Sequence, residues 1–510
     1  MKTRDSKNVP PHRDEASARI STGTAGLDAV LLGGLPAKRM YLLQGDPGVG
    51  KTTLALRFLL EGSSHGDACL YVTLSETGEE LSAVARSHGW SLDALTVYEM
   101  SASEGNVAEP DENTLYVPAE VELGERIGAL LEVVDRVKPS RVVIDSCSEL
   151  RLLAQSPLRF RRQVLALKER LVKRDCTVLL LENPVTTGGD TLLQSLVHGV
   201  IVMEQLSPVY GAERRRMRVV KMREVSFRGG YHDLVIRSGG VEVFPRLIAA
   251  EHREQFAPEL VKSGVEGLDS LLEGGLDRGT SALLMGPAGS GKSAIATRYI
   301  CAAAERGEKG VIFSFDEGLE ILLTRAEKLG MPLRRYIDAG LVKVQQVDPA
   351  ELSPGEFTSV VRESVEQLGA RIVVIDSLNG YLHAMPEERF LTAHLHEVLA
   401  FLRHRGVLTI MVMVQHGFVG RMDGPVDVSY VADTVVLTRY FEASGRVRKA
   451  ISVVKKRSGS HEDTIREFSV GVGGVVVGPP LTDFHGVLTG VPEFDGRDSG
   501  TLLGRAGSAP

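Results

Sequence analysis

The chain has 510 residues, of which 43% are hydrophobic and 25% are charged, and its formal net charge is −7. This composition is typical of a folded globular protein and excludes disorder or a fibrous repeat for most of the chain. The negative balance gives no support to a basic protein that coats nucleic acid or an anionic membrane. At about 150 residues per domain, the length predicts three or four domains.

The cysteines and apolar segments indicate an intracellular protein. Cys69, Cys147, Cys176 and Cys301 are far apart and form neither a C-x-x-C pair nor a disulfide framework. The N-terminal segment has no apolar stretch like that of a signal peptide. The longest apolar run, near residues 407–414, is far shorter than a membrane span. We therefore expect a cytoplasmic enzyme or regulator.

Two parts of the chain repeat the same order of motifs. The first copy contains STGTAGLD at 21–28, GGL at 33–35 and GDPGVGKT at 45–52. The second contains SGVEGLD at 263–269, GGL at 274–276 and GPAGSGKS at 286–293. Corresponding residues are 241 positions apart, since both 269 − 28 and 292 − 51 give this offset. A constant offset over three motifs indicates an internal duplication and reduces the expected number of domains to two.

The duplication also predicts the domain boundaries. We expect a first domain at residues 20–247, a linker at 248–260 and a second domain at 261–478. The segments at 1–19 and 479–510 are rich in Pro, Gly and charge and are expected to be mobile tails.

An α/β fold is predicted within each copy. Runs rich in β-branched residues, at 281–284, 310–315, 371–375 and 407–414, alternate with longer helical patterns. Such alternation favours a mainly parallel sheet flanked by helices, so the chain is expected to hold two tandem domains of this kind. The chemistry should then lie in loops at the carboxyl ends of the strands.

Each copy carries G-x-x-x-x-G-K-[ST] between an apolar strand and a helix. Backbone N–H groups of such a loop converge on phosphate oxygens, and the helix N-terminus favours the anion. The lysine would reach the β- and γ-phosphates of ATP. The predicted nucleotide-binding residues are Gly45, Gly48, Gly50, Lys51, Thr52 and Thr53, and Gly286, Gly289, Gly291, Lys292 and Ser293. A glycine-rich turn without ligand is the alternative, which the duplication disfavours.

Asp145 and Asp376 each end a strongly apolar strand and are followed by serine. A carboxylate at this place can hold Mg²⁺ through water, as a Walker B residue does. We therefore predict Mg²⁺ sites at Asp145 with Thr52 and at Asp376 with Ser293. The alternative is an aspartate that caps the N-terminus of a helix. The aspartate recurs beside a complete P-loop in both copies, which makes this alternative weaker.

The two aspartates are only 231 residues apart, whereas the P-loop motifs are 241 apart. This difference places about ten additional residues in the first copy, in a surface loop at 101–118.

Hydrolysis needs a carboxylate that accepts a proton or positions water near the γ-phosphate. The candidates end the strand after the P-loop helix: Glu76 in the first copy, and Asp316 and Glu317 in the second. Solvated charges at a strand end are the competing interpretation. The copies differ here, which allows the two domains to differ in rate or reaction.

Taken together, these motifs resemble the KaiC family of two-domain ATPases in the RecA-like P-loop superfamily. The resemblance covers about residues 20–477 and includes the duplication, and the chain looks like a member of non-cyanobacterial type. It implies a homohexamer of two stacked rings with ATP between neighbouring subunits. Lys221 and Arg223 would then reach the nucleotide of the next subunit in the first ring, and Lys455 and Arg457 in the second. Without the resemblance, solvated basic residues at strand ends would be an equally good interpretation of these four residues.

The resemblance further implies serine/threonine autophosphorylation by the second domain. In the matching segment, at residues 428–434, Ser429 falls on the first phosphoacceptor position, but Tyr430 replaces the family's threonine. Asp316 replaces a glutamate and carries its carboxylate one methylene farther back. We therefore expect ATP hydrolysis first, and treat phosphorylation of Ser429 as a hypothesis beside an ordinary surface serine. A KaiB-like protein or a signalling kinase is the expected partner.

Two other functions remain open. RecA-like proteins include nucleic-acid-dependent ATPases, and the basic segment at 213–218 could line a pore or be a solvated strand edge. The net charge and the lack of an evident basic and aromatic stretch make nucleic acid the weaker partner. The other alternative is a nucleotide-gated scaffold with little turnover.

Overall fold

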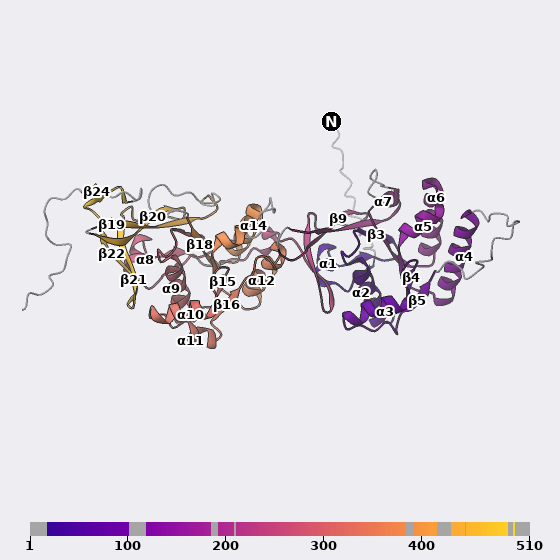
Figure 1. Ribbon diagram of the computed structural model, residues 1–510, viewed down its shortest axis with the longest axis horizontal. Coiled ribbons are helices and arrows are strands. Elements are labelled where there is room, and N and C mark those ends of the chain that lie inside the picture. Colours follow the sequence, from indigo (N-terminus) through magenta and orange to yellow (C-terminus); the bar gives the residue numbers. More distant parts are fainter. Residues whose placement is uncertain are drawn as a thin grey trace, which may run out of the picture. The chain divides into compact units, whose positions relative to one another are not determined.

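The chain forms two compact units, which meet in the sequence between Arg246 and Leu247 (Figure 1). The computed structural model describes residues 18–100, 119–184, 192–208, 211–383, 391–415, 430–443, 445–487 and 493–494. The loop expected at 101–118 lies outside these residues.

A nine-stranded sheet forms the centre of the first unit. Its order is β11 (Gly240–Phe244), β10 (His232–Arg237), β9 (Arg214–Met222), β8 (Gly199–Leu206), β3 (Met40–Gly45), β7 (Thr177–Glu182), β6 (Arg141–Asp145), β4 (Cys69–Thr73) and β5 (Thr96–Glu99). The strands from β8 to β5 run parallel, whereas β9, β10 and β11 extend the sheet in antiparallel fashion. The mainly parallel sheet predicted from the sequence is confirmed.

Helices cover both faces of this sheet. They are α1 (Ala25–Val30), α2 (Lys51–Ser64), α3 (Gly78–Ser87), α4 (Ala119–Val137), α5 (Cys147–Ala154), α6 (Pro157–Val172) and α7 (Leu192–Leu196). Successive strand residues point to opposite faces. Leu43 therefore packs with Phe58 of α2, while Leu42 belongs to a second core with Phe160 of α6. A short pair, β1 (Arg19–Ile20) and β2 (Leu35–Pro36), precedes the sheet.

The second unit repeats this topology. Its sheet order is β16 (Val342–Gln346), β15 (Gly310–Ser314), β17 (Ile372–Asp376), β18 (Leu408–Val414), β14 (Ser281–Gly286), β19 (Thr434–Ala443), β20 (Arg446–Lys456), β21 (Arg466–Gly471) and β22 (Gly474–Pro480). Its helices are α8 (Glu266–Leu271), α9 (Lys292–Glu305), α10 (Leu319–Lys328), α11 (Leu333–Asp338), α12 (Pro354–Glu366), α13 (Leu378–His383) and α14 (Leu391–His404). The pairs β12 (Leu260–Val261) with β13 (Leu276–Asp277), and β23 (Phe484–His485) with β24 (Glu493–Phe494), complete the unit. These are two RecA-like α/β domains in tandem.

The structure differs from the expected boundaries at two places. The segment expected as a linker, 248–260, begins with the 3₁₀ helix Ala249–His252, and Ala249 is buried in the core of the second unit. The start of the expected C-terminal tail is also folded: β22 reaches Pro480, and Val487 is buried against Phe441. Apolar side chains in these short segments find partners on strands and helices distant in sequence, which local composition does not reveal.

The four cysteines are all buried and free. Within the described part of the chain, no helix combines the length and the apolar character needed to cross a membrane.

Candidate nucleotide-binding sites

Both P-loops join a central strand to the helix that follows it, at the carboxyl end of the parallel strands. The first runs from Gly45, the last residue of β3, to Gly50, which caps α2 in a left-handed conformation with φ of 103°. The second runs from Gly286 at the end of β14 to Gly291, which caps α9 with φ of 107°. The helix N-terminus and its free backbone N–H groups can therefore face an anion held in the loop.

The side chains of the P-loop lysines donate hydrogen bonds to backbone carbonyls of their own loops. Lys51 Nζ donates hydrogen bonds to the carbonyls of Gly45 (2.6 Å) and Asp46 (2.9 Å). Lys292 Nζ donates to the carbonyl of Pro287 (2.7 Å). Burial lowers the pKa of Lys51, and it lowers the pKa of Lys292 to about 8. Each lysine is thus a desolvated cation beside the loop that would hold phosphate.

The predicted magnesium ligands lie together in the first domain. Thr52 Oγ1 donates a hydrogen bond of 3.2 Å to Asp145 Oδ2, and the buried Tyr71 hydroxyl donates to the same oxygen at 2.6 Å. Asp145 ends β6, so it lies at the same sheet edge as the P-loop. Thr53, which we also predicted to contact the nucleotide, is buried in the first turn of α2.

The second domain has the same pair. Burial raises the pKa of Asp376, while a hydrogen bond from the Ser293 hydroxyl and the nearby Arg325 oppose this rise. In both domains a carboxylate and a hydroxyl, which are hard oxygen donors suited to Mg²⁺, meet beside the P-loop. The residues present therefore fit a magnesium ion.

Glu76 lies where the sequence predicted a catalytic carboxylate. It follows β4, is half-buried, and its Oε2 atom has no hydrogen-bond partner among the described residues. Burial and the neighbouring Asp145 carboxylate raise the pKa of Glu76. A partly desolvated carboxylate with a free oxygen can accept a proton from water.

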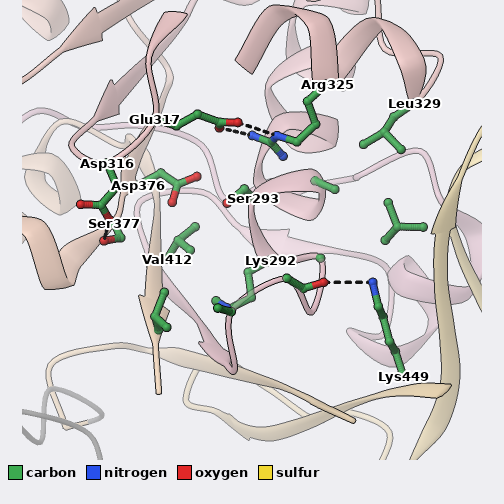
Figure 2. Close-up of a pocket in the computed structure, with 16 residues that line it drawn as sticks. Lys292, Ser293, Asp316, Glu317, Arg325, Leu329, Asp376, Ser377, Val412 and Lys449 are labelled. Atoms are coloured by element: carbon green, nitrogen blue, oxygen red, sulfur yellow. Dashed lines mark hydrogen bonds and ion pairs between the residues drawn. The ribbon is translucent and has the colours of Figure 1, made fainter. Parts of the chain in front are cut away.

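The second domain surrounds its P-loop with a cavity of about 510 Å³. Figure 2 shows Lys292, Ser293, Asp376, Asp316 and Glu317 around this cavity, from the P-loop and from the ends of two neighbouring strands. Asp316 accepts a hydrogen bond from the Ser377 hydroxyl, and Glu317 is paired with Arg325 of α10. The predicted P-loop, Walker B and strand-end residues thus meet in one place.

Sequence reasoning missed three residues at these sites. Tyr71 orients Asp145, Arg325 binds Glu317, and Lys449 of β20 donates to the P-loop carbonyl of Gly289 at 3.0 Å (Figure 2). None of the three belongs to a motif, because each reaches the site from a different strand or helix. For Tyr71 and Arg325, the available signal in the sequence was a difference between the copies. The residue that corresponds to Tyr71 in the second copy is Ile312, and the residue that corresponds to Arg325 in the first copy is Val84.

The four residues expected to act on a neighbouring subunit lie away from their own P-loops. In the register of the sheet, Lys221 lies opposite Val200 of β8, and Val200 lies opposite Leu42 in the middle of β3. The P-loop begins farther along β3, at Gly45. Lys455 is likewise level with Leu283 on β14, before the P-loop at Gly286.

These cations bind backbone carbonyls of their own domain. Lys221 Nζ donates to the carbonyls of Gln194 and Val197, and Arg223 donates to that of Ser195, around the end of α7. Lys455 donates to the carbonyl of Ala432 and Arg457 to that of Tyr430. Ser429, the predicted phosphoacceptor, lies outside the described residues.

Two P-loops, each beside a Walker B aspartate and a strand-end carboxylate on a RecA-like sheet, define a duplicated P-loop ATPase. A family model described as "ATPase: KaiC" matches the chain twice, at residues 20–248 and 261–482. The chain belongs to this KaiC ATPase family, as its resemblance predicted, and it is a nucleotide-binding protein of that family.

Curated relatives match the chain over nearly its full length. It is 25% identical to "Circadian clock oscillator protein KaiC" of Picosynechococcus sp., over 96% of this chain and 95% of the relative. The protein of the same name from Thermosynechococcus vestitus is 25% identical over 98% of both chains. "Circadian clock protein KaiC3" of Synechocystis sp. is 24% identical over 93% of this chain and 95% of the relative.

Proposed function

We propose that each domain binds MgATP at its P-loop and that the chain hydrolyses ATP as a signalling protein. The observation that carries this proposal is the cavity of the second domain, where Lys292, Ser293, Asp376 and Asp316 meet around one space. These are the groups that phosphoryl transfer requires: a cation for the phosphates, oxygen donors for Mg²⁺ and a carboxylate for water.

The chain's residues take the following roles in this proposal. The P-loop N–H groups and Lys51 or Lys292 bind the phosphates, and Thr52 with Asp145, or Ser293 with Asp376, hold Mg²⁺. The bound Mg²⁺ supplies positive charge for the phosphate oxygens. Glu76 in the first domain orients the attacking water and accepts its proton, and its partial burial supports this role because it favours proton uptake. Asp316 or Glu317 acts in the second domain.

The proposed active form is a homohexamer of two rings. Its support is the position of Lys221 and Lys455, each of which is level with the middle of the P-loop strand rather than with its carboxyl end. Lys221, Arg223, Lys455 and Arg457 would therefore act on the ATP of a neighbouring subunit. Such cations stabilise charge on the transferred phosphoryl group and link turnover to assembly.

Autophosphorylation of Ser429 by the second domain is the further part of the proposal. It rests on the family's known reaction and on the match of segment 428–434, with Tyr430 in place of the second acceptor. A KaiB-like protein or a signalling kinase would respond to the nucleotide state. The curated relatives are named as circadian clock proteins.

A nucleic-acid-dependent ATPase has less support. In the basic segment, Arg216 forms an ion pair of 2.9 Å with Glu204 and lies over the Tyr231 ring, and Arg215 donates to Gln205. Single-stranded DNA that strongly stimulated turnover, with a steep loss at high salt, would favour this alternative.

The test is to incubate the full-length chain with γ-labelled ATP and Mg²⁺ and to follow both released phosphate and protein-bound label. We expect Glu76→Gln to remove the phosphate release by the first domain. The double variant Asp316→Asn with Glu317→Gln should remove the release by the second domain. Protein-bound label should disappear in Ser429→Ala. If all carboxylate variants matched the parent, the catalytic roles would be wrong. ATP binding without released phosphate would indicate the scaffold.

A further inference from the structure

The strand-end turns of the two domains have the same backbone geometry. Thr73 and Ser314 each donate a side-chain hydrogen bond of 2.6 Å to the carbonyl three residues later, that of Glu76 and Glu317. The residue after each strand donates its N–H to the Walker B aspartate carbonyl at 2.7 Å, in Leu74 to Asp145 and Phe315 to Asp376. Glu76 and Glu317 are therefore equivalent positions on equivalent turns.

The surroundings of these two glutamates differ. Glu76 Oε2 is buried and has no hydrogen-bond partner among the described residues. Both oxygens of Glu317 instead accept hydrogen bonds from Arg325, from Nε at 3.1 Å and from an Nη at 2.7 Å. Figure 2 shows this pair at the edge of the cavity, beside Ser293 and Asp376.

One residue accounts for the difference. Arg325 lies on α10, and the corresponding residue of α3 is Val84, since 325 − 84 is the repeat offset of 241. Val84 packs against the first domain's core and offers no charge to Glu76. A bidentate guanidinium–carboxylate pair fixes the orientation of the carboxylate and engages both of its oxygens. A general base needs an oxygen that is free to approach water.

We propose that Arg325 is a positioning residue that holds Glu317 away from the attacking water, so that the shorter Asp316 accepts the proton in the second domain. This inference rests on the proposed ATP hydrolysis. It makes the first domain the faster ATPase and the second domain the restrained one. The restraint is built into α10, outside every nucleotide-binding motif.

Asp316 is suited to the remaining role. It lies on the same turn, lines the cavity and is anchored by the Ser377 hydroxyl directly after the Walker B aspartate. Its side chain is one methylene shorter than that of Glu317, so its carboxylate lies farther from a water at the P-loop. A misplacement of about 1 Å can cost on the order of a hundredfold in rate, so a slow second domain is expected.

The experiment uses the full-length chain with Glu76→Gln, so that phosphate release reports the second domain. Arg325→Val installs the residue of the first domain. We expect kcat to rise about tenfold, which is less than the factor of about 10²–10⁴ that a positioned base contributes in full, while KM stays within about twofold. Arg325→Lys keeps the charge but not the bidentate pair and should give an intermediate kcat.

The reciprocal variant transfers the restraint to the first domain. In a chain carrying Asp316→Asn and Glu317→Gln, Val84→Arg should lower kcat about tenfold by pairing with Glu76, a part of the factor of about 10²–10⁴ that a positioned base contributes. In the Glu76→Gln chain, Arg334→Val is the matched control for Arg325→Val, because Arg334 pairs with Glu320 and Glu327 at the surface and its loss should leave kcat unchanged. Thermal unfolding checks that each variant is folded, and Arg325→Gln replaces Arg325→Val if the valine variant is not.

The outcomes separate this inference from the proposed function. A parent chain that releases no phosphate overturns the proposed function. With an active parent, an unchanged or lower kcat in folded Arg325→Val overturns the inference alone. A higher KM with unchanged kcat would also overturn it, because Arg325 would then bind the nucleotide itself.

Discussion

The two P-loop lysines differ in the charges around them. The Lys51 ammonium has both Asp145 and Asp46 nearby, which partly offset the effect of its burial on its pKa. Among the described residues, only Asp376 offsets the burial of Lys292, and the pKa of Lys292 falls to about 8. The binding of an anion to the second domain is therefore expected to depend on pH in a range accessible to experiment.

Lys292 is predicted to take up a proton when ATP binds at alkaline pH. Above about pH 8 the free lysine loses its proton, whereas the phosphates favour the charged form. The ATP affinity of the second domain should thus fall as the pH rises through this value. Calorimetry at about pH 9, in buffers with different heats of ionisation, measures the uptake in a chain carrying Lys51→Ala.

The control for this prediction is Lys292→Arg. A guanidinium keeps its proton at this pH, so the variant should bind ATP without proton uptake at this position. Equal uptake by both proteins would show that another group titrates.

At the level of elements, an antiparallel strand packs on the last glycine of each P-loop. A Cβ on Gly291 would lie 2.8 Å from Phe468 and Val470 of β21, and one on Gly50 would lie 2.8 Å from Ile236 of β10. Both glycines also have positive φ values, which side chains rarely adopt. The antiparallel half of each sheet therefore supports the start of the P-loop helix.

Gly291→Ala should damage both stability and nucleotide binding in the second domain. The strained φ of about 107° and the contacts with β21 together should cost about 1–3 kcal/mol in the free energy of unfolding. Denaturant unfolding and an ATP titration measure the two effects. Gly307→Ala is the matched control, because Gly307 also has a positive φ but has open space around it. Equal losses in both variants would show that packing on β21 is unimportant.

At the level of the whole molecule, each unit has its own core, P-loop and candidate catalytic carboxylates. Two domains with the same topology can therefore carry out different tasks without sharing a site. The proposed contribution of Lys221 and Arg223 to another subunit would connect copies of one domain within a ring.

Mixing two inactive variants should restore hydrolysis by the first domain. In chains that carry Asp316→Asn and Glu317→Gln, Glu76→Gln and Arg223→Ala should each be inactive alone. In a mixed ring, some sites combine an intact Glu76 with an intact Arg223 from the neighbouring subunit. Phosphate release above the sum of the separate proteins would support action between subunits. Release equal to that sum, in rings shown to be mixed by native mass spectrometry, would contradict it.

The sequence by itself determined the features whose residues are contiguous. The P-loops and the strands ending at Asp145 and Asp376 are short motifs, and their shape follows from local backbone requirements. The duplication, the mainly parallel sheets and the family were predicted for the same reason, because their signals repeat along the chain.

Only the tertiary structure decided which side chains meet across elements. Arg325 binds Glu317 because α10 returns along the strand-end turn, and Tyr71 reaches Asp145 from the neighbouring strand. Residues 249 and 487 belong to the second unit because apolar surfaces far away in sequence bury them. Such pairings depend on the packing of distant segments, which neither spacing nor composition encodes locally. The P-loops and Walker B strands of the two sites therefore look alike as motifs, whereas Arg325, which no motif contains, distinguishes the surroundings of Glu317 from those of Glu76.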